Sequence, residues 1–188
     1  MSLTTTETSI CNSALIKIGA DRINSLTETN KRAQLCSEQY SKVRDEVLRS
    51  HPWNFAITRA EFAQLSTTPA FGYTYHFSIP SDCLRILNLS DETIEWKQEG
   101  NKLLTDSATV KARYIKRVTA PAEFDSFFIE ALALRLAADL SYSLVQSTTL
   151  SSMMTQQYEK HLAFARSYDA QEGTPPELTD DSFIEARI

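Results

Sequence analysis

Glycine is scarce in this sequence, which argues against the common nucleotide-binding loops. The 188 residues include four glycines, each isolated from the others. A phosphate-cradling loop needs several closely spaced glycines, because its backbone must approach the phosphates. Long apolar runs are also missing, since no segment reaches the roughly 18 consecutive apolar residues of a membrane-spanning helix. Residues 1–7 are polar and lack the basic and apolar stretches of a secretory signal, so we expect synthesis in a cytoplasm.

Cysteine is equally sparse. The three cysteines (Cys11, Cys36 and Cys83) are odd in number, lie far apart and form no Cys-x-x-Cys pair. This pattern favours reduced core thiols over a disulfide framework or a zinc site. The net charge of −5 argues against electrostatic binding of duplex DNA, because that affinity depends on clustered lysine and arginine. It remains compatible with a protein past which DNA slides.

The overall composition and the chain length indicate one folded domain. Hydrophobic residues make up 42% of the chain and charged residues 23%, which is ordinary for a globular protein. A chain of 188 residues is long enough for one substantial core and short for two.

Two helices are predicted in the first fifty residues. The first covers about residues 5–18, because Thr4 and Glu7 have the spacing of a capping box. The second covers about residues 31–49 and ends before Pro52. Its apolar residues recur every three or four positions and form one stripe, typical of a helix packed on a core: Ala33, Cys36, Tyr40, Val43 and Val47.

In the middle of the chain, large apolar residues alternate with small or polar ones, which predicts strands. The alternating aromatic residues are Phe71, Tyr73, Tyr75 and Phe77. Residues 93–96 and 102–104 flank a Glu99-Gly100-Asn101 turn and predict a hairpin. Together these segments predict an antiparallel sheet of about four strands.

The helical period returns after the strands. Residues 126–145 are apolar over more than half of the helix surface, so we expect this helix to be the most buried element, with Leu132 and Leu136 in the core. A fourth helix continues to about Gly173, and one of its faces carries Leu150, Met154, Tyr158, Leu162 and Ala165.

These elements predict an α+β fold that is mainly helical. About four helices form two hairpins, at residues 5–50 and 126–172, and a small antiparallel β-sheet is inserted at about 71–118. Both hairpins belong to a single domain, residues 1–173, because neither hairpin alone buries enough surface. Residues 174–188 contain Pro175-Pro176 and predict an extended C-terminal tail.

The residues that carry chemistry form no recognisable catalytic or metal-binding pattern. Hydrolysis needs a nucleophile, a base and an orienting group, and no Gly-x-Ser-x-Gly elbow or metal-ligand spacing accompanies His51, His76 or His161. We interpret all three histidines as structural or exposed, with His161 on the polar side of the last helix. Asp91-Glu92 and Asp180-Asp181 fall in predicted turns or the tail and indicate a solvated surface. We therefore expect no enzymatic activity, no metal and no cofactor.

Two aromatic residues follow the end of the second helix, in the sequence Pro52-Trp53-Asn54-Phe55-Ala56. Such large rings directly after a helix anchor a reversal of the chain into a core. The alternative is a stacking platform for nucleic-acid bases, which would require more basic residues than Arg59 nearby.

Packing motifs recur along most of the chain, at Asn12–Gly19, Pro52–Ala56, the strand at Tyr114, Phe124–Phe128, Leu134–Leu140, Tyr158–Ala165 and Asp169. Together they resemble the phage tail tubular protein A family, the head-to-tail adaptors or gatekeepers of short-tailed, double-stranded-DNA phages. The resemblance covers roughly residues 7–171.

The resemblance implies a virion protein of the tail connector, without a membrane partner. Twelve copies would form a ring beneath the portal protein, continue the DNA channel and support the tail nozzle protein. DNA would pass through the channel without sequence-specific binding. Twelve copies of a chain with net charge −5 carry roughly −60 in total, and acidic residues facing the channel would repel the passing phosphates.

The C-terminal tail is the predicted portal-docking segment. Phe183, Ile184 and Ile188 provide an apolar anchor, and Arg187 provides a partner for a carboxylate. We expect the isolated protein to be largely monomeric and to form its ring on the portal, where neighbouring copies meet at high effective concentration. A C-terminus without any role is the alternative for the tail. For the whole chain, the alternatives are a small tail-associated hydrolase, which a histidine scan would reveal, and a cytoplasmic regulatory binding domain, which would form a low-order oligomer indifferent to portal.

Overall fold

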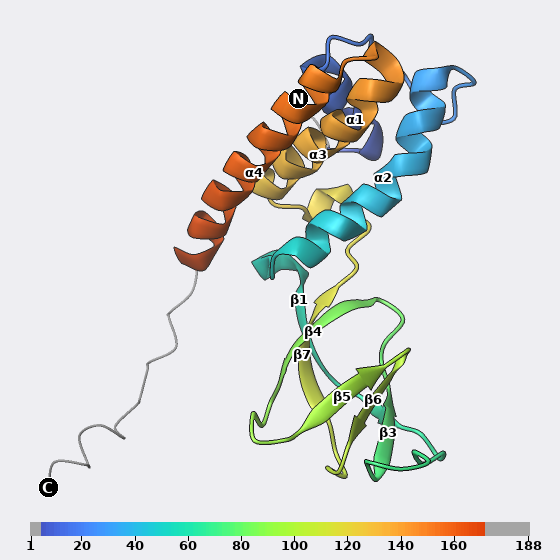
Figure 1. The fold of residues 1–188 in the computed structure, drawn as a ribbon, viewed down its shortest axis with the longest axis vertical. Helices are drawn as coiled ribbons and strands as arrows, with labels where there is room; N and C mark the ends of the chain where they lie inside the picture. The colour runs from blue at the N-terminus through green and yellow to red at the C-terminus, as the bar shows by residue number, and fades with distance from the viewer. Residues whose placement is uncertain (1–4, 172–188) are drawn as a thin grey trace, which may run out of the picture.

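The computed structural model describes residues 5–171, which form a helical body and a β region at one end of it (Figure 1). Every strand of this described part lies in sequence between the second and third helices. The predicted α+β class is therefore confirmed. The helices are α1 (Glu7–Lys17), α2 (Lys31–Ser50), α3 (Ser126–Val145) and α4 (Thr148–Gln171).

The first two helices begin at side-chain caps. Thr6 caps α1: its hydroxyl accepts a hydrogen bond from the Ser9 amide at 3.1 Å, and Ser9 Oγ accepts one from the Thr6 amide at 2.9 Å. The predicted cap at Thr4 is wrong, because this reciprocal pair starts the helix later. Asn30 caps α2, where its Oδ1 accepts from the Ala33 amide at 2.9 Å. All five residues of the predicted α2 stripe are buried, which confirms that interpretation.

α3 is the central helix of the body. The helices α1, α2 and α4 all pack against it, and α1 and α2 contact it more extensively than they contact each other. Ten of its 20 residues are buried, and Leu132 and Leu136 have no exposed surface. On the last helix, the predicted apolar face is also confirmed. Met154, Leu162 and Ala165 are buried, while Leu150 and Tyr158 are half-buried against the same core.

The β region contains two small antiparallel sheets. The first has the order β1-β7-β4 and consists of β1 (Ile57–Glu61), β4 (Cys83–Leu89) and β7 (Lys111–Lys116). The second has the order β2-β3-β6-β5 and consists of β2 (Ala63–Gln64), β3 (Tyr75–Ser78), β5 (Trp96–Glu99) and β6 (Lys102–Thr105). The predicted hairpin around Gly100 is confirmed as β5–β6. Its first strand was expected to begin at residue 93, but β5 begins at Trp96.

The start of the β region was predicted incorrectly. Strands begin at Ile57, directly after a short 3-10 turn, η1 (Asn54–Ala56), and not near residue 71. Phe71 lies in the loop between β2 and β3 and is 89% exposed. Gly72 follows it with φ +89°, a left-handed conformation that interrupts an extended strand. The alternating aromatic residues therefore begin before the strand: Phe71 and Tyr73 lie in the loop, and only Tyr75 and Phe77 lie in β3.

Two apolar clusters hold these parts together. The larger cluster contains residues from all four helices, as expected for helices that bury their faces jointly. The smaller cluster lies in the β region and includes Phe77, Leu103 and Tyr114. Neighbouring side chains of a strand point to opposite faces, so Ile115 of β7 belongs to the helical cluster while Tyr114 belongs to the β cluster. One strand thus contributes to both cores.

Candidate assembly surfaces

The junction between the helical body and the β region is built around Trp53. Its side chain is 1% exposed, and its Nε1 donates a hydrogen bond to the Val47 carbonyl at 3.0 Å. The indole meets the Phe128 ring edge to face, with the ring centroids 5.3 Å apart. This packing confirms that Trp53 anchors the chain reversal. It fixes where β1 leaves the helical body.

The end of α4 is attached to the same junction. His51 Nε2 lies 2.8 Å from Asp169 Oδ2. The Asn54 amide donates to Asp169 Oδ1 at 3.1 Å, and the Asn54 side chain donates to the Asp169 carbonyl at 2.9 Å. These contacts place the C-terminal end of α4 beside the residues that lead into β1.

The other two histidines lie in different surroundings. His161 Nε2 lies 2.9 Å from the Phe127 carbonyl, and its ring stacks on Phe127. The prediction that His161 lies on the polar side of α4 is therefore wrong, because the side chain packs against the start of α3. His76 Nδ1 is buried without a hydrogen-bond partner among the described residues. Across residues 5–171, no group of His, Cys, Asp or Glu residues is arranged to hold a metal ion.

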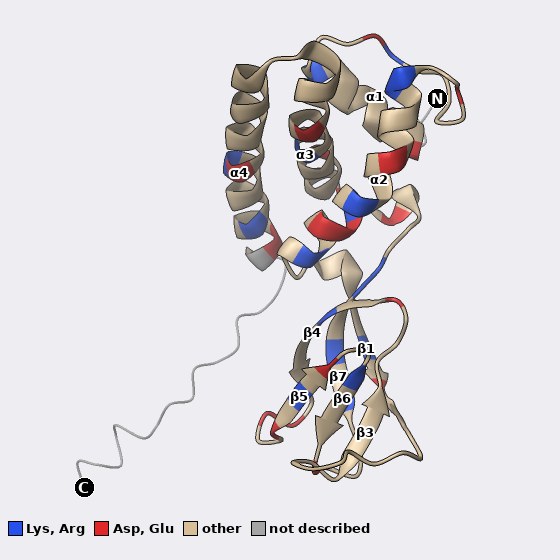
Figure 2. Ribbon diagram, turned by 45° about the vertical axis from the view of Figure 1, so that its right-hand side comes forward, with Lys and Arg blue, Asp and Glu red and all other residues tan. Residues whose placement is uncertain are grey.

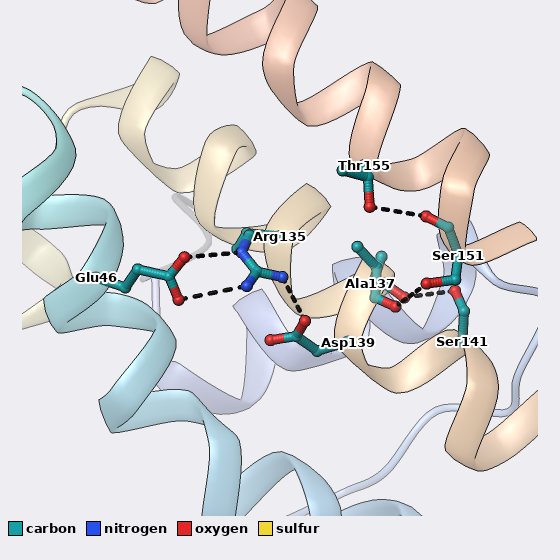
Figure 3. Close-up of polar contacts among 8 residues, drawn as sticks. Glu46, Arg135, Ala137, Asp139, Ser141, Ser151 and Thr155 are labelled. Atoms are coloured by element: carbon teal, nitrogen blue, oxygen red, sulfur yellow. Dashed lines mark hydrogen bonds and ion pairs between the residues drawn. The ribbon is translucent and has the colours of Figure 1, made fainter. Parts of the chain in front are cut away.

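A charged network joins α2 to α3 (Figure 3). Arg135 Nε donates to Glu46 Oε1 at 3.1 Å, and the guanidinium also contacts Glu46 Oε2 and Asp139. Burial alone lowers the pKa of Arg135, but hydrogen bonds and charge attraction from both carboxylates raise it overall. The arginine therefore stays charged and holds the two helices at a defined spacing.

Hydroxyl groups join α3 to α4 in the same region. Ser151 Oγ of α4 donates to the Ala138 carbonyl of α3 at 3.0 Å. Ser141 Oγ donates to the Ala137 carbonyl at 2.6 Å, within α3 (Figure 3). Such bonds satisfy hydroxyls in a closely packed helix pair without requiring a charged group.

Large apolar side chains remain exposed at several places on the described residues, including Ile16 of α1 at 50%. Met153 and Phe164 are 50% and 66% exposed on α4, which forms an outer edge of the helical body in Figure 1. Tyr142, at the end of α3, is 63% exposed. In the β region, Phe71 of the β2–β3 loop is exposed. Aromatic residues are enriched at protein–protein contact surfaces.

Strands β1 and β7 bring two arginines together on the open face of the first sheet. Arg59 lies directly opposite Arg113, so their side chains project from the same face with Cβ atoms about 5 Å apart. Arg113 Nε donates to Asn88 Oδ1 at 3.1 Å. Within residues 5–171, neither arginine forms an ion pair. Both line a shallow depression of about 680 Å³ together with Lys111, and Figure 2 shows basic segments grouped on these strands.

The residues predicted for portal docking, Phe183, Ile184, Arg187 and Ile188, lie outside the described residues. The exposed aromatics of α4 and the arginine pair were not predicted. Phe164 falls off the apolar stripe of its helix, a signal that was available in the sequence. The pairing of Arg59 with Arg113 depends on strand register and had no sequence signal. None of the helices in residues 5–171 is long and apolar enough to cross a bilayer.

Comparison with known proteins found one family. The family model described as tail tubular protein (Tube) matches residues 9–174. No curated protein matched the chain.

Proposed function

This chain belongs to the tail tubular protein family, and we propose that it is the adaptor between portal and tail in a short-tailed phage. Its role is structural, and it is a component of the phage tail. In the proposed role, twelve copies form a ring beneath the portal protein, extend the DNA channel and carry the tail nozzle protein. The family match carries this proposal, because residues 9–174 include both the helical body and the β region.

The placement of the exposed apolar residues supports ring formation. Phe164 of α4 and Phe71 of the β2–β3 loop belong to different parts of the molecule. A contact between two different surfaces of neighbouring copies is heterologous, and it closes into a ring when the rotation between copies permits. A contact between the Phe164 surface of one copy and the Phe71 surface of its neighbour would thus fit cyclic assembly better than a two-fold dimer that uses one surface twice.

The charge distribution bears on the DNA channel. Five of the 24 acidic residues fall in residues 172–188, with only one of the 19 basic residues. The remaining chain is therefore nearly neutral. In the proposed ring, repulsion of passing DNA depends on which acidic residues face the channel, and the total charge of the body contributes little. We propose that DNA passes without sequence-specific binding.

We propose that the C-terminal segment docks onto the portal. Phe183, Ile184 and Ile188 supply apolar contact, and Arg187 supplies a charge-assisted partner for a portal carboxylate. A docking segment of this length adds affinity through linkage to the helical body, where each copy also meets its neighbours.

Electron microscopy of the protein mixed with the portal of its own phage tests the adaptor role. We expect twelve-fold rings bound to the portal, and largely monomeric protein when the portal is omitted. The portal of an unrelated phage is the matched control. Free protein beside undecorated portals at micromolar concentration would contradict the proposal.

A second set of variants tests the docking segment. We expect the triple variant F183A/I184A/I188A to lose most portal binding, while E177Q, in the same segment, retains it. If the triple variant binds the portal with unchanged affinity, docking belongs to the helical body and not to this segment.

A further inference from the structure

The pairing of Arg59 with Arg113 needs a physical explanation. Like charges directly opposite each other on neighbouring strands repel and destabilise the pair. The carboxylates that line the same depression contact groups other than the two arginines: Glu61 lies 4.0 Å from Lys111 Nζ, and Glu92 accepts a hydrogen bond from the Asn88 side chain at 3.2 Å. Three cations and two carboxylates therefore line this face, and the arginine pair has no anionic partner within residues 5–171.

We propose that this face binds the acidic C-terminal segment, residues 172–188, of the same chain. The segment contains five carboxylates and one arginine. Its Asp180-Asp181 pair presents two adjacent carboxylates to the two opposed guanidinium groups, and arginine recognises carboxylates through paired, charge-assisted hydrogen bonds. This proposal concerns the free protein and does not depend on the adaptor function.

The place where α4 ends makes the contact reachable. Asp169 is bonded to Asn54, and Asn54 is at most about 18 Å from Arg59 along an extended chain. Asp180 follows the last residue of α4, Gln171, by nine positions, and nine extended residues span about 30 Å. The Asp180-Asp181 pair is therefore within reach of the arginine pair.

The contact would occur within one molecule, which favours the chain's own segment over other acidic ligands. A short tether holds the carboxylates at a local concentration in the millimolar range, so a few exposed ion pairs are sufficient. Such pairs are screened by salt, since the Debye length falls from about 8 Å at physiological ionic strength to about 3 Å at 1 M. The bound carboxylates would offset the repulsion between Arg59 and Arg113.

Carbodiimide cross-linking of the full chain, mapped by mass spectrometry, tests the proposal. Lys111 provides the amine next to the arginine pair. In the native chain we expect an amide cross-link from Lys111 to Asp180 or Asp181, at a yield independent of protein concentration and lost in 1 M NaCl. In R59Q/R113Q we expect this yield to fall at least tenfold. The Lys111–Glu61 cross-link should persist in the variant and reports that β1 and β7 remain paired.

The control is K97Q/K102Q, which removes the same charge from the other sheet and should leave the Lys111–Asp180 or Lys111–Asp181 yield unchanged. Equal yields in R59Q/R113Q and the native chain overturn the proposal. Cross-links found only in covalent dimers also overturn it, because the ligand is then the segment of another copy. A third contrary outcome is that the protein retards a short DNA duplex in a gel, that R59Q/R113Q abolishes the retardation, and that D180N/D181N does not enhance it. This face would then bind phosphate and not the segment.

Discussion

Asp169 and His51 lie 118 positions apart in sequence, yet their side chains approach to 2.8 Å. The contact joins the last part of α4 to the residue that ends α2. Asp169 Oδ1 also accepts a hydrogen bond from the Asn54 amide. One carboxylate therefore positions both the end of α2 and the start of the β region. Both side chains of the His51–Asp169 pair are mostly buried, at 14% and 15% exposure, which makes this contact more important for stability than an ordinary surface pair.

We expect D169A to lower the free energy of unfolding by about 1–3 kcal/mol, because the substitution leaves partly buried donors without their acceptor. Urea unfolding followed by circular dichroism measures the change. E159A, an exposed position on the same helix, is the control and should change stability by less than about 0.5 kcal/mol. Equal stability of the two variants would show that the Asp169 contacts contribute little.

Truncating a core side chain in α3 should lower the free energy of unfolding more than D169A does. L132A or L136A removes a side chain with no exposed surface, and we expect each to cost about 2–5 kcal/mol through lost burial and the cavity left behind. M153A, at a half-exposed position of α4, serves as the comparison. A small effect of L136A, similar to that of M153A, would mean that α3 is not the centre of the core.

The Glu46–Arg135 contact should show coupling in a double-mutant cycle. From E46A, R135A and the double variant, we expect a coupling free energy of about 0.5–1 kcal/mol, since both groups are partly solvated. High salt should reduce the coupling because it screens the charges. Additive single effects would indicate that Arg135 contributes through its packing alone.

The exposed aromatic residues should matter for assembly and not for folding. We expect F164A and F71A to unfold within about 0.5 kcal/mol of the native chain but to form portal-bound rings at least tenfold less readily, a loss of about 1.4 kcal/mol or more, because aromatic residues dominate contact energies. Q157A, exposed on α4, is the matched control. Native-like ring formation by both aromatic variants would place the subunit contact elsewhere.

Cysteine alkylation should depend strongly on pH. Burial, followed by the charge of Asp82, raises the pKa of Cys83 to about 11. The reactive thiolate is therefore rare near neutrality, and the labelling rate should rise about tenfold per pH unit between pH 8 and 10. Cys11 and Cys36 are fully buried, and the pKa of Cys11 is raised by its hydrogen bond to Cys36 and by burial.

Mass spectrometry after iodoacetamide treatment measures all three sites. Cys11 and Cys36 should stay unmodified until denaturant is added. A flat pH profile for Cys83, or rapid labelling of Cys36 in the native protein, would contradict the burial of these thiols.

The helices could be predicted from the sequence because their signal is local. The stripe from Ala33 to Val47 follows the helical repeat, and α3 is apolar over more than half of its surface, so burial follows directly from the spacing of residues. Strands carry less of this information. β1 is five residues long and follows a turn, and its pattern does not distinguish it from the loop that contains Phe71.

The local patterns of the sequence determined the α+β class, the four helices and the faces that they bury, because each of these depends on residues within one or two turns of one another. Only the tertiary structure decided that Arg59 faces Arg113 and that Asp169 reaches His51. Strand register and the packing of distant helix ends depend on the whole fold at once, and no local repeat in the sequence specifies them.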